Sequence, residues 1–175
     1  VWFADFSEFK TPGRYHIEEP NARFRSFPFT IGDGVYGKVM NAATKMFYYN
    51  RANTPVTAQF GGAWNHKGGH LGPNQDKAAQ FIQGGKPQGR PKDLTGGWYD
   101  AGDYTKYIPF LSATLFNLFL AYERNGAVFP DNTGIPESGN GIPDLLDELR
   151  WELNWTLKMQ DADGGVHNRN GSATH

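Results

Sequence analysis

Two aspartates three residues apart are the densest chemical signal in the sequence. Asp100 and Asp103 lie in the run Gly-Gly-Trp-Tyr-Asp-Ala-Gly-Asp at residues 96–103. Two ionised carboxylates that hold one water molecule between them form a general base. The two leading glycines let the backbone approach a ligand closely, and Trp98 places a flat ring beside the acids. The run is therefore typical of a subsite that binds a sugar ring and activates water.

A purely structural role for the two aspartates is the alternative. Apolar spacing predicts a helix over residues 104–124, with Asp103 at or near its N-cap. Free backbone N–H groups in that first turn would help to keep both carboxylates ionised. In the alternative interpretation, Asp103 only caps the helix and Asp100 only closes a turn.

The elements that must position these residues are mainly helical. Helical spacing of apolar residues predicts two further helices, over residues 33–50 with Asp33 as N-cap and over residues 143–160. The helix over residues 104–124 is apolar on both sides, which predicts that it is buried. Residues 51–103 show no sustained period and predict either the irregular rim of an active site or a disordered insert.

The N-terminal part reads differently from the rest. Short β-like runs separated by turn residues predict two or three strands, within residues 1–9, 14–18 and 24–31. A free-standing β-sandwich needs about seven strands. We therefore interpret this part as the trailing end of a β-domain.

Composition excludes several classes of protein. The chain has 175 residues and a formal net charge of -1, which argues against a nucleic-acid binder and against a basic membrane-surface protein. No apolar run is long enough to cross a membrane. Aromatic residues make up 15% of the chain, more than a small core needs, so some rings are expected to face a neutral ligand such as a sugar. The chain has no cysteine, which excludes disulfides and thiolate zinc sites.

Two longer blocks resemble a known family. Residues 96–107 resemble the hallmark of glycoside hydrolase family 9, and residues 136–148 with the stretch that follows resemble the family's next block, in the same order. Residues 26–36 resemble the junction between an immunoglobulin-like domain and the catalytic domain in bacterial members. The resemblance implies a mainly α fold. Residues 32–175 would be the N-terminal portion of an (α/α)6 barrel, which is incomplete in this sequence. Residues 1–31 would be the trailing strands of the immunoglobulin-like domain.

The resemblance also implies an activity, the inverting hydrolysis of β-1,4-glucosidic bonds in cellulose or related β-glucans. Asp103 would be the general base, and Asp100 would help to hold the water. The family's general acid is a glutamate that would lie beyond His175, so the chain alone is expected to be inactive on cellulose and to need the remainder of the catalytic domain as its partner. Mixed-linkage glucan, xyloglucan and exo-acting oligosaccharide specificities remain open, as does a non-catalytic β-glucan-binding module. Export from the cell is implied, although no signal-peptide pattern opens the chain.

Substrate contacts are expected from aromatic and polar side chains near the acids. Trp98 is the first choice for stacking on a glucose ring, Trp64 and Tyr104 are weaker choices, and His70 is expected to be a polar rim residue. The segment that holds His66 and His70 resembles a region where some family members bind structural zinc with two cysteines and two histidines. The absence of cysteine argues against zinc here.

A second possible metal site follows from the residues before the last helix. Glu137, Asn140 and Asp144 could bring oxygen ligands together around calcium. In the alternative, Asn140 and Asp144 only satisfy backbone N–H groups at the start of the helix. No cofactor is required by the implied reaction.

Overall fold

The computed structural model describes residues 3–21 and 23–171. The chain divides into two compact units, Val1–Met40 and Asn41–His175. Within the described residues, no helix has both the length and the apolar character that a membrane crossing requires.

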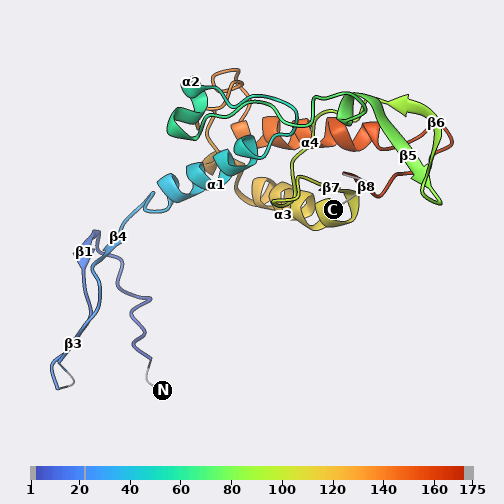
Figure 1. Cartoon of the computed structure of the whole chain (residues 1–175). Coiled ribbons are helices and arrows are strands. Elements are labelled where there is room, and N and C mark those ends of the chain that lie inside the picture. The colour runs from blue at the N-terminus through green and yellow to red at the C-terminus, as the bar shows by residue number, and fades with distance from the viewer. Residues whose placement is uncertain (1–2, 22, 172–175) are drawn as a thin grey trace. The chain divides into compact units, whose positions relative to one another are not determined.

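The first unit is built on one long, interrupted β-hairpin (Figure 1). Strand β1 (Gly13–Tyr15) pairs antiparallel with β4 (Phe29–Ile31), and β2 (Glu18–Glu19) pairs with β3 (Phe24–Arg25). Residues 3–9 form no strand, so the prediction of a strand there is wrong, and residues 1 and 2 of that run lie outside the described residues. Their aromatic residues pack on the hairpin instead, for example Phe6 on Phe29 with ring centroids 5.5 Å apart.

Helix α1 (Gly37–Tyr49) confirms the first predicted helix. Its expected cap is wrong, because Asp33 lies in a turn that precedes the helix by several residues. Thr44 and Tyr48 are its buried residues, and the Tyr48 ring packs in a small cluster with Val56 and Ile135.

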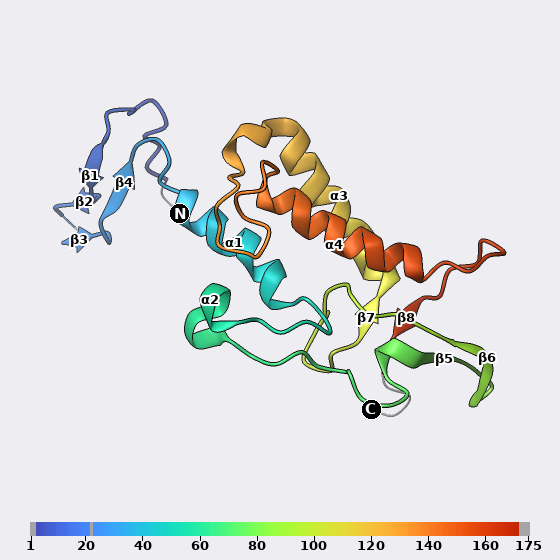
Figure 2. The ribbon, with the colours of Figure 1, turned by 90° about the horizontal axis from the view of Figure 1, so that it is seen from above.

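Helix α4 (Asp144–Lys158) is the central element of the second unit, and it confirms the last predicted helix. Its leucines at helical spacing, Leu145 and Leu149, are 1% exposed and form a core with Trp98. Helix α3 (Ile108–Asn125) lies beside α4 in both views and contributes Leu111, Leu115 and Leu118 to this core (Figure 2). The short helix η3 (Gly126–Val128) follows α3.

The prediction that α3 is buried on both sides is wrong. None of its residues is fully buried, and three phenylalanines, Phe110, Phe116 and Phe119, are exposed by 60%, 65% and 41%. Leu111, Leu115 and Leu118 pack on the core that contains Leu145 and Leu149 of α4. Within the described residues, α3 therefore leaves several apolar rings exposed outside its contact with α4.

Residues 51–103 are more regular than their sequence predicts. They contain α2 (Ala58–Gly61), the 3-10 helices η1 (Gly62–Trp64) and η2 (Asp76–Ala78), and the antiparallel hairpin β5 (Ala79–Gln83) and β6 (Lys86–Lys92). Gly84 and Gly85 form the two-residue hairpin turn with φ angles of 58° and 74°, a conformation that favours glycine at both positions. Strand β7 (Lys106–Tyr107) pairs with β8 (Arg169–Asn170) directly before α3 begins.

Candidate active site

The two aspartates lie on a short loop between Trp98 and β7, which we call the acidic loop (residues 99–105). The backbone N–H of Asp100 donates to the Thr105 carbonyl at 3.0 Å, and the N–H of Tyr104 donates to the Ala101 carbonyl at 2.9 Å. These bonds close the loop and leave Asp100 and Asp103 exposed. The predicted cap is wrong: Asp103 accepts from the Thr105 N–H at 3.3 Å, and α3 begins only after β7.

The entry to the acidic loop is fixed by the chain segment that follows α1. Ala52 donates its backbone N–H to the Gly97 carbonyl at 2.8 Å, and Tyr99 donates to the Asn50 carbonyl at 2.9 Å. Arg51 and Trp98 form an antiparallel bridge between these bonds. The backbone directly before Asp100 is therefore held by its pairing with residues 50–52.

Trp98 anchors this entry through buried contacts. Its side chain is 6% exposed, and its ring lies 4.6 Å from the Phe47 ring, centroid to centroid. Its Nε1 donates to Glu148 Oε2 at 3.2 Å. The core thus covers most of the Trp98 side chain, and its stacking on glucose stays a prediction.

Arg51 connects the same entry to α4. Its Nη1 and Nη2 donate to the two Glu137 oxygens at 2.9 and 3.0 Å, and its Nε donates to Glu148 Oε2 at 3.2 Å. The guanidinium also lies 4.6 Å from the Trp151 ring. Burial raises the pKa of Glu148 to about 7, against the lowering effect of Arg51.

Lys106 fixes the exit of the acidic loop. Its fully buried Nζ donates to the Leu94 and Gly96 carbonyls at 2.8 Å each and to Asp76 Oδ2 at 2.9 Å. Burial lowers the pKa of Lys106, and the Asp76 carboxylate opposes this shift. The ammonium therefore joins the residues before the acidic loop to the residue directly after it.

A group of aromatic rings lies beside the acidic loop. The Tyr99 and Tyr104 rings are 4.9 Å apart, and the His70 ring is 5.4 and 5.7 Å from them, centroid to centroid. Tyr104 is 53% exposed. Two of the predicted substrate residues, His70 and Tyr104, are thus brought together, whereas Trp64 is 76% exposed on η1 and outside this group. Their contact with a sugar stays a prediction.

The three residues proposed for calcium have separate protein partners. Glu137 binds Arg51 with both oxygens, and Asn140 Oδ1 accepts from the Ile142 N–H at 2.7 Å. Asp144 Oδ2 accepts from the backbone and hydroxyl of Thr133 at 2.6 Å each, and its Oδ1 is buried without a hydrogen-bond partner. In the alternative to calcium binding, Asn140 and Asp144 only satisfy backbone N–H groups at the start of the helix. Both residues do accept from backbone N–H groups, but those groups belong to the loop that precedes α4. This arrangement does not gather three free oxygen ligands, and whether calcium binds here stays untested by the structure.

Comparison with known proteins assigns the family. The sequence profile described as "Glycosyl hydrolase family 9" matches residues 36–175. The chain belongs to glycosyl hydrolase family 9. Among its relatives, the "Xyloglucan-specific endo-beta-1,4-glucanase BoGH9A" of Bacteroides ovatus is 38% identical over 94% of this chain and 28% of its own length. The "Cellulose 1,4-beta-cellobiosidase" of Acetivibrio thermocellus is 36% identical over 91% of this chain and 20% of its own length.

A solved structure agrees with this assignment. The structure titled "Bacteroides ovatus GH9" superposes with a TM-score of 0.77 at 35% identity, over 95% of this chain and 30% of that chain. The chain therefore spans less than a third of the length of these family 9 relatives. Because of this partial coverage, the activity of the whole protein is a proposal.

Proposed function

We propose that this chain supplies the water-activating part of a glycoside hydrolase that cleaves β-1,4-glucosidic bonds in cellulose or a related β-glucan. Relatives at 36–38% identity are named as a xyloglucan-specific endoglucanase and a cellobiosidase. The observation that carries the proposal is the acidic loop itself: Asp100 and Asp103 are exposed on a closed loop that Lys106 and the Arg51–Trp98 pairing fix at its two ends.

The proposed mechanism is inverting hydrolysis. Asp103 accepts a proton from a water molecule while Asp100 helps to hold that water, and the oxygen attacks the anomeric carbon from one face of the sugar. A carboxylic acid on the opposite side, roughly 6.5–9.5 Å from the base, protonates the leaving oxygen. The buried framework contributes by keeping both carboxylates in place before substrate binds.

We propose that the acid is supplied from outside this chain. Two glutamates in it are held by Arg51, namely Glu137 and Glu148, and Glu152 is fully buried. None of these three is placed to donate a proton to a glycosidic oxygen in solvent. The chain alone should then be inactive on cellulose, and the remainder of a catalytic domain is its expected partner.

The proposed architecture is the beginning of an (α/α)6 barrel. The exposed phenylalanines of α3 support it, because an apolar helix face of this kind is normally covered by neighbouring helices. We further propose that residues 1–31 end an immunoglobulin-like domain, that residues 32–175 begin the catalytic domain, and that the enzyme acts outside the cell, where polymeric glucan is found.

A chimera tests the proposed chemistry directly. Residues 36–175 replace the equivalent segment of the Bacteroides ovatus xyloglucan-specific enzyme, and release of reducing sugar is measured on xyloglucan, cellulose and mixed-linkage glucan. Asp103→Asn should lower kcat by at least about a thousandfold, since the general base is lost, and Asp100→Asn should lower it less. Asp93→Asn is the matched control, because Asp93 is an exposed aspartate outside the acidic loop.

Two results would contradict the proposal. The first is full activity of the Asp103→Asn chimera, and the second is hydrolysis of cellulose by the isolated 175-residue chain. Affinity electrophoresis of the isolated chain in glucan gels tests the binding-module alternative, for which exposed Trp64 and Tyr104 are the candidate contacts. Retarded migration of the chain, combined with an inactive chimera, would favour that alternative.

A further inference from the structure

Asn53 is the centre of a hydrogen-bond network beside the acidic loop, and no step of the proposed mechanism uses it. Its Nδ2 is shared among the Gly69 carbonyl at 3.2 Å, the His70 carbonyl at 3.4 Å and Asp76 Oδ2 at 2.8 Å. Its Oδ1 accepts from the Gly96 N–H at 3.0 Å. One half-buried side chain therefore joins three separate segments of the chain, at residues 69–70, 76 and 96.

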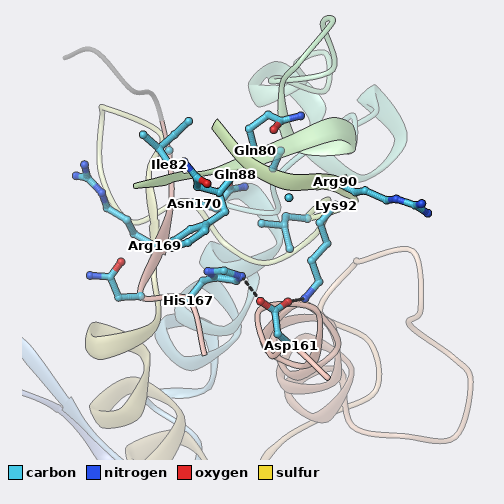
Figure 3. A pocket seen from close by; sticks show the side chains of 15 residues that line it. Gln80, Ile82, Gln88, Arg90, Lys92, Asp161, His167, Arg169 and Asn170 are labelled. Atoms are coloured by element: carbon cyan, nitrogen blue, oxygen red, sulfur yellow. Dashed lines mark hydrogen bonds and ion pairs between the residues drawn. The ribbon is translucent and has the colours of Figure 1, made fainter. Parts of the chain in front are cut away.

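The segment that precedes the acidic loop is the fixed end of this network. Lys158, the last residue of α4, donates from Nζ to the Thr95 carbonyl at 2.8 Å. Farther back along the same segment, Lys92 Nζ binds Asp161 Oδ1 at 2.6 Å, shortly after the end of α4 (Figure 3). Asn53 is therefore bonded to a segment that α4 and the residues after it hold in place.

The other end of the network reaches the rings that flank the acidic pair. The His70 ring lies 5.4 Å from the Tyr99 ring and 5.7 Å from the Tyr104 ring, centroid to centroid. Tyr99 directly precedes the first aspartate of the acidic loop, and Tyr104 directly follows the second. The Asn53 backbone N–H also donates to the Tyr99 hydroxyl at 3.4 Å. A movement of the Asn53 amide would therefore be passed to both ends of the acidic pair.

The backbone of this network is strained at three places. Asn53, His70 and Tyr104 have φ angles of 64°, 55° and 56°, in the left-handed region that residues other than glycine rarely adopt. Among the described residues, only two other non-glycine residues have a positive φ. Such conformations cost free energy and persist only where surrounding contacts hold them. Three of them beside the acidic loop indicate that contacts, and not local preference, impose its geometry.

We infer that Asn53 is a positioning residue for the acidic pair. Its amide holds the His70 segment against the segment before the acidic loop, and the His70 ring in turn packs on the two tyrosines. Both polar atoms of the amide are occupied by protein groups, so the side chain acts through the loop and not on the sugar. Two carboxylates can share one water only at a fixed separation, and a displacement of about 1 Å can lower the rate about a hundredfold. This inference rests on the proposed function.

The chimera described above tests this role, because it separates kcat from KM. Asn53→Gly removes the amide but keeps a residue that accepts a φ of 64°. It should lower kcat about tenfold to a hundredfold and change KM by less than about twofold, because orientation is lost and no substrate contact is.

Asn74→Gly is the matched control. Asn74 is also a left-handed asparagine, with a φ of 56°, but it is exposed. Its side chain makes no hydrogen bond within residues 3–21 and 23–171. Asn74→Gly should therefore leave both kcat and KM unchanged.

A double variant tests whether Asn53 acts through His70. His70→Asn removes the ring but keeps a residue type that tolerates a positive φ. If the two side chains act along one path, the Asn53→Gly/His70→Asn variant should have a kcat within about threefold of the slower single variant. Losses that multiply would contradict the path through His70.

Hydrogen exchange in the 175-residue chain gives a readout that needs no hydrolysis. The Tyr104 amide donates to the Ala101 carbonyl inside the acidic loop, and Asn53 bonds to neither residue. Asn53→Gly should speed exchange of this amide by about tenfold or more, and Asn74→Gly should not. Circular dichroism confirms that each variant is folded under the conditions used.

Three outcomes would overturn the inference: an unchanged kcat in the Asn53→Gly chimera, a loss that appears mainly in KM, and unchanged exchange at Tyr104. The parent chimera and its Asp103→Asn variant test the proposed hydrolase function separately. An active parent with an unaffected Asn53→Gly variant would remove the positioning role alone. An inactive parent would remove the proposed function, and the exchange measurement would still decide whether Asn53 holds the acidic loop.

Discussion

Replacement of Lys106 by methionine tests whether one buried ammonium holds the two ends of the acidic loop together. The change keeps the length of the side chain but removes the donor to the Leu94 and Gly96 carbonyls and to Asp76 Oδ2. Asp76 is 5% exposed and would be left as a buried carboxylate without its cation. Removal of one partner of a buried ion pair costs about 3–5 kcal/mol. Because Asn53 Nδ2 still donates to Asp76 at 2.8 Å, we expect about 3 kcal/mol.

The free energy of unfolding of the chain in urea measures this loss, and a double-mutant cycle assigns it to the pair. Asp76→Asn should also destabilise, and the Lys106→Met/Asp76→Asn double variant should lose at least about 1 kcal/mol less than the sum of the single variants. Lys92→Met is the control, because the Lys92–Asp161 pair is half-exposed and worth about 1 kcal/mol or less. Hydrogen exchange at the Tyr104 amide, which donates to Ala101, should speed up in Lys106→Met. A loss below about 1 kcal/mol, with unchanged exchange at Tyr104, would refute the proposed clamp.

Three further predictions concern pH, backbone conformation and metal. Burial raises the pKa of Glu148 to about 7 and of Glu152 to about 8, so the native chain keeps protons that the unfolded chain releases near pH 4–5. Stability should therefore fall as pH rises from 5 to 8, and Glu152→Gln should flatten this fall in thermal melts; an unchanged slope would contradict it. Gly97→Ala should destabilise the chain by about 2 kcal/mol or more in urea, because its φ is 76° and an added Cβ would lie 2.7 Å from the Trp155 ring, whereas Gly102→Ala meets nothing within 4 Å and should be neutral. Equilibrium dialysis against micromolar calcium should retain no ion, since the three proposed ligands have protein partners; bound calcium would show that these contacts rearrange.

The sequence predicts the strongly periodic helices well. The ranges 33–50 and 143–160 correspond to α1 and α4 within a few residues. These helices are predictable because the helical spacing of their apolar residues can be read from a short stretch of sequence. The β5–β6 hairpin was missed because β6 holds two prolines and a glycine in a polar run, and the pairing shifts register between Ala79 and Phe81. The Gly84-Gly85 pair was the available signal for its turn.

The sequence singles out the acidic pair but not the residues that support it. Both aspartates of the acidic pair are exposed, and their role stays a prediction. The predicted cap at Asp103 is wrong because β7 pairs with a strand more than 60 residues later. No local pattern indicates the bond from Trp98 to Glu148, because these residues are 50 positions apart. Arg51 was missed altogether, and Lys106, although inside the recognised motif, was given no role.

The partners of the acidic loop have a consequence for the order of events during synthesis. Arg51 bonds to Glu148, 97 residues later, and the Gly97 carbonyl accepts from Trp151, 54 residues later. At about 5–20 residues per second, a ribosome needs roughly 3–10 s to extend the chain from Gly97 to Trp151. Throughout that interval the acidic loop exists without α4, the helix that supports it. The nascent polypeptide therefore cannot assemble its two aspartates into their final geometry until α4 has been translated.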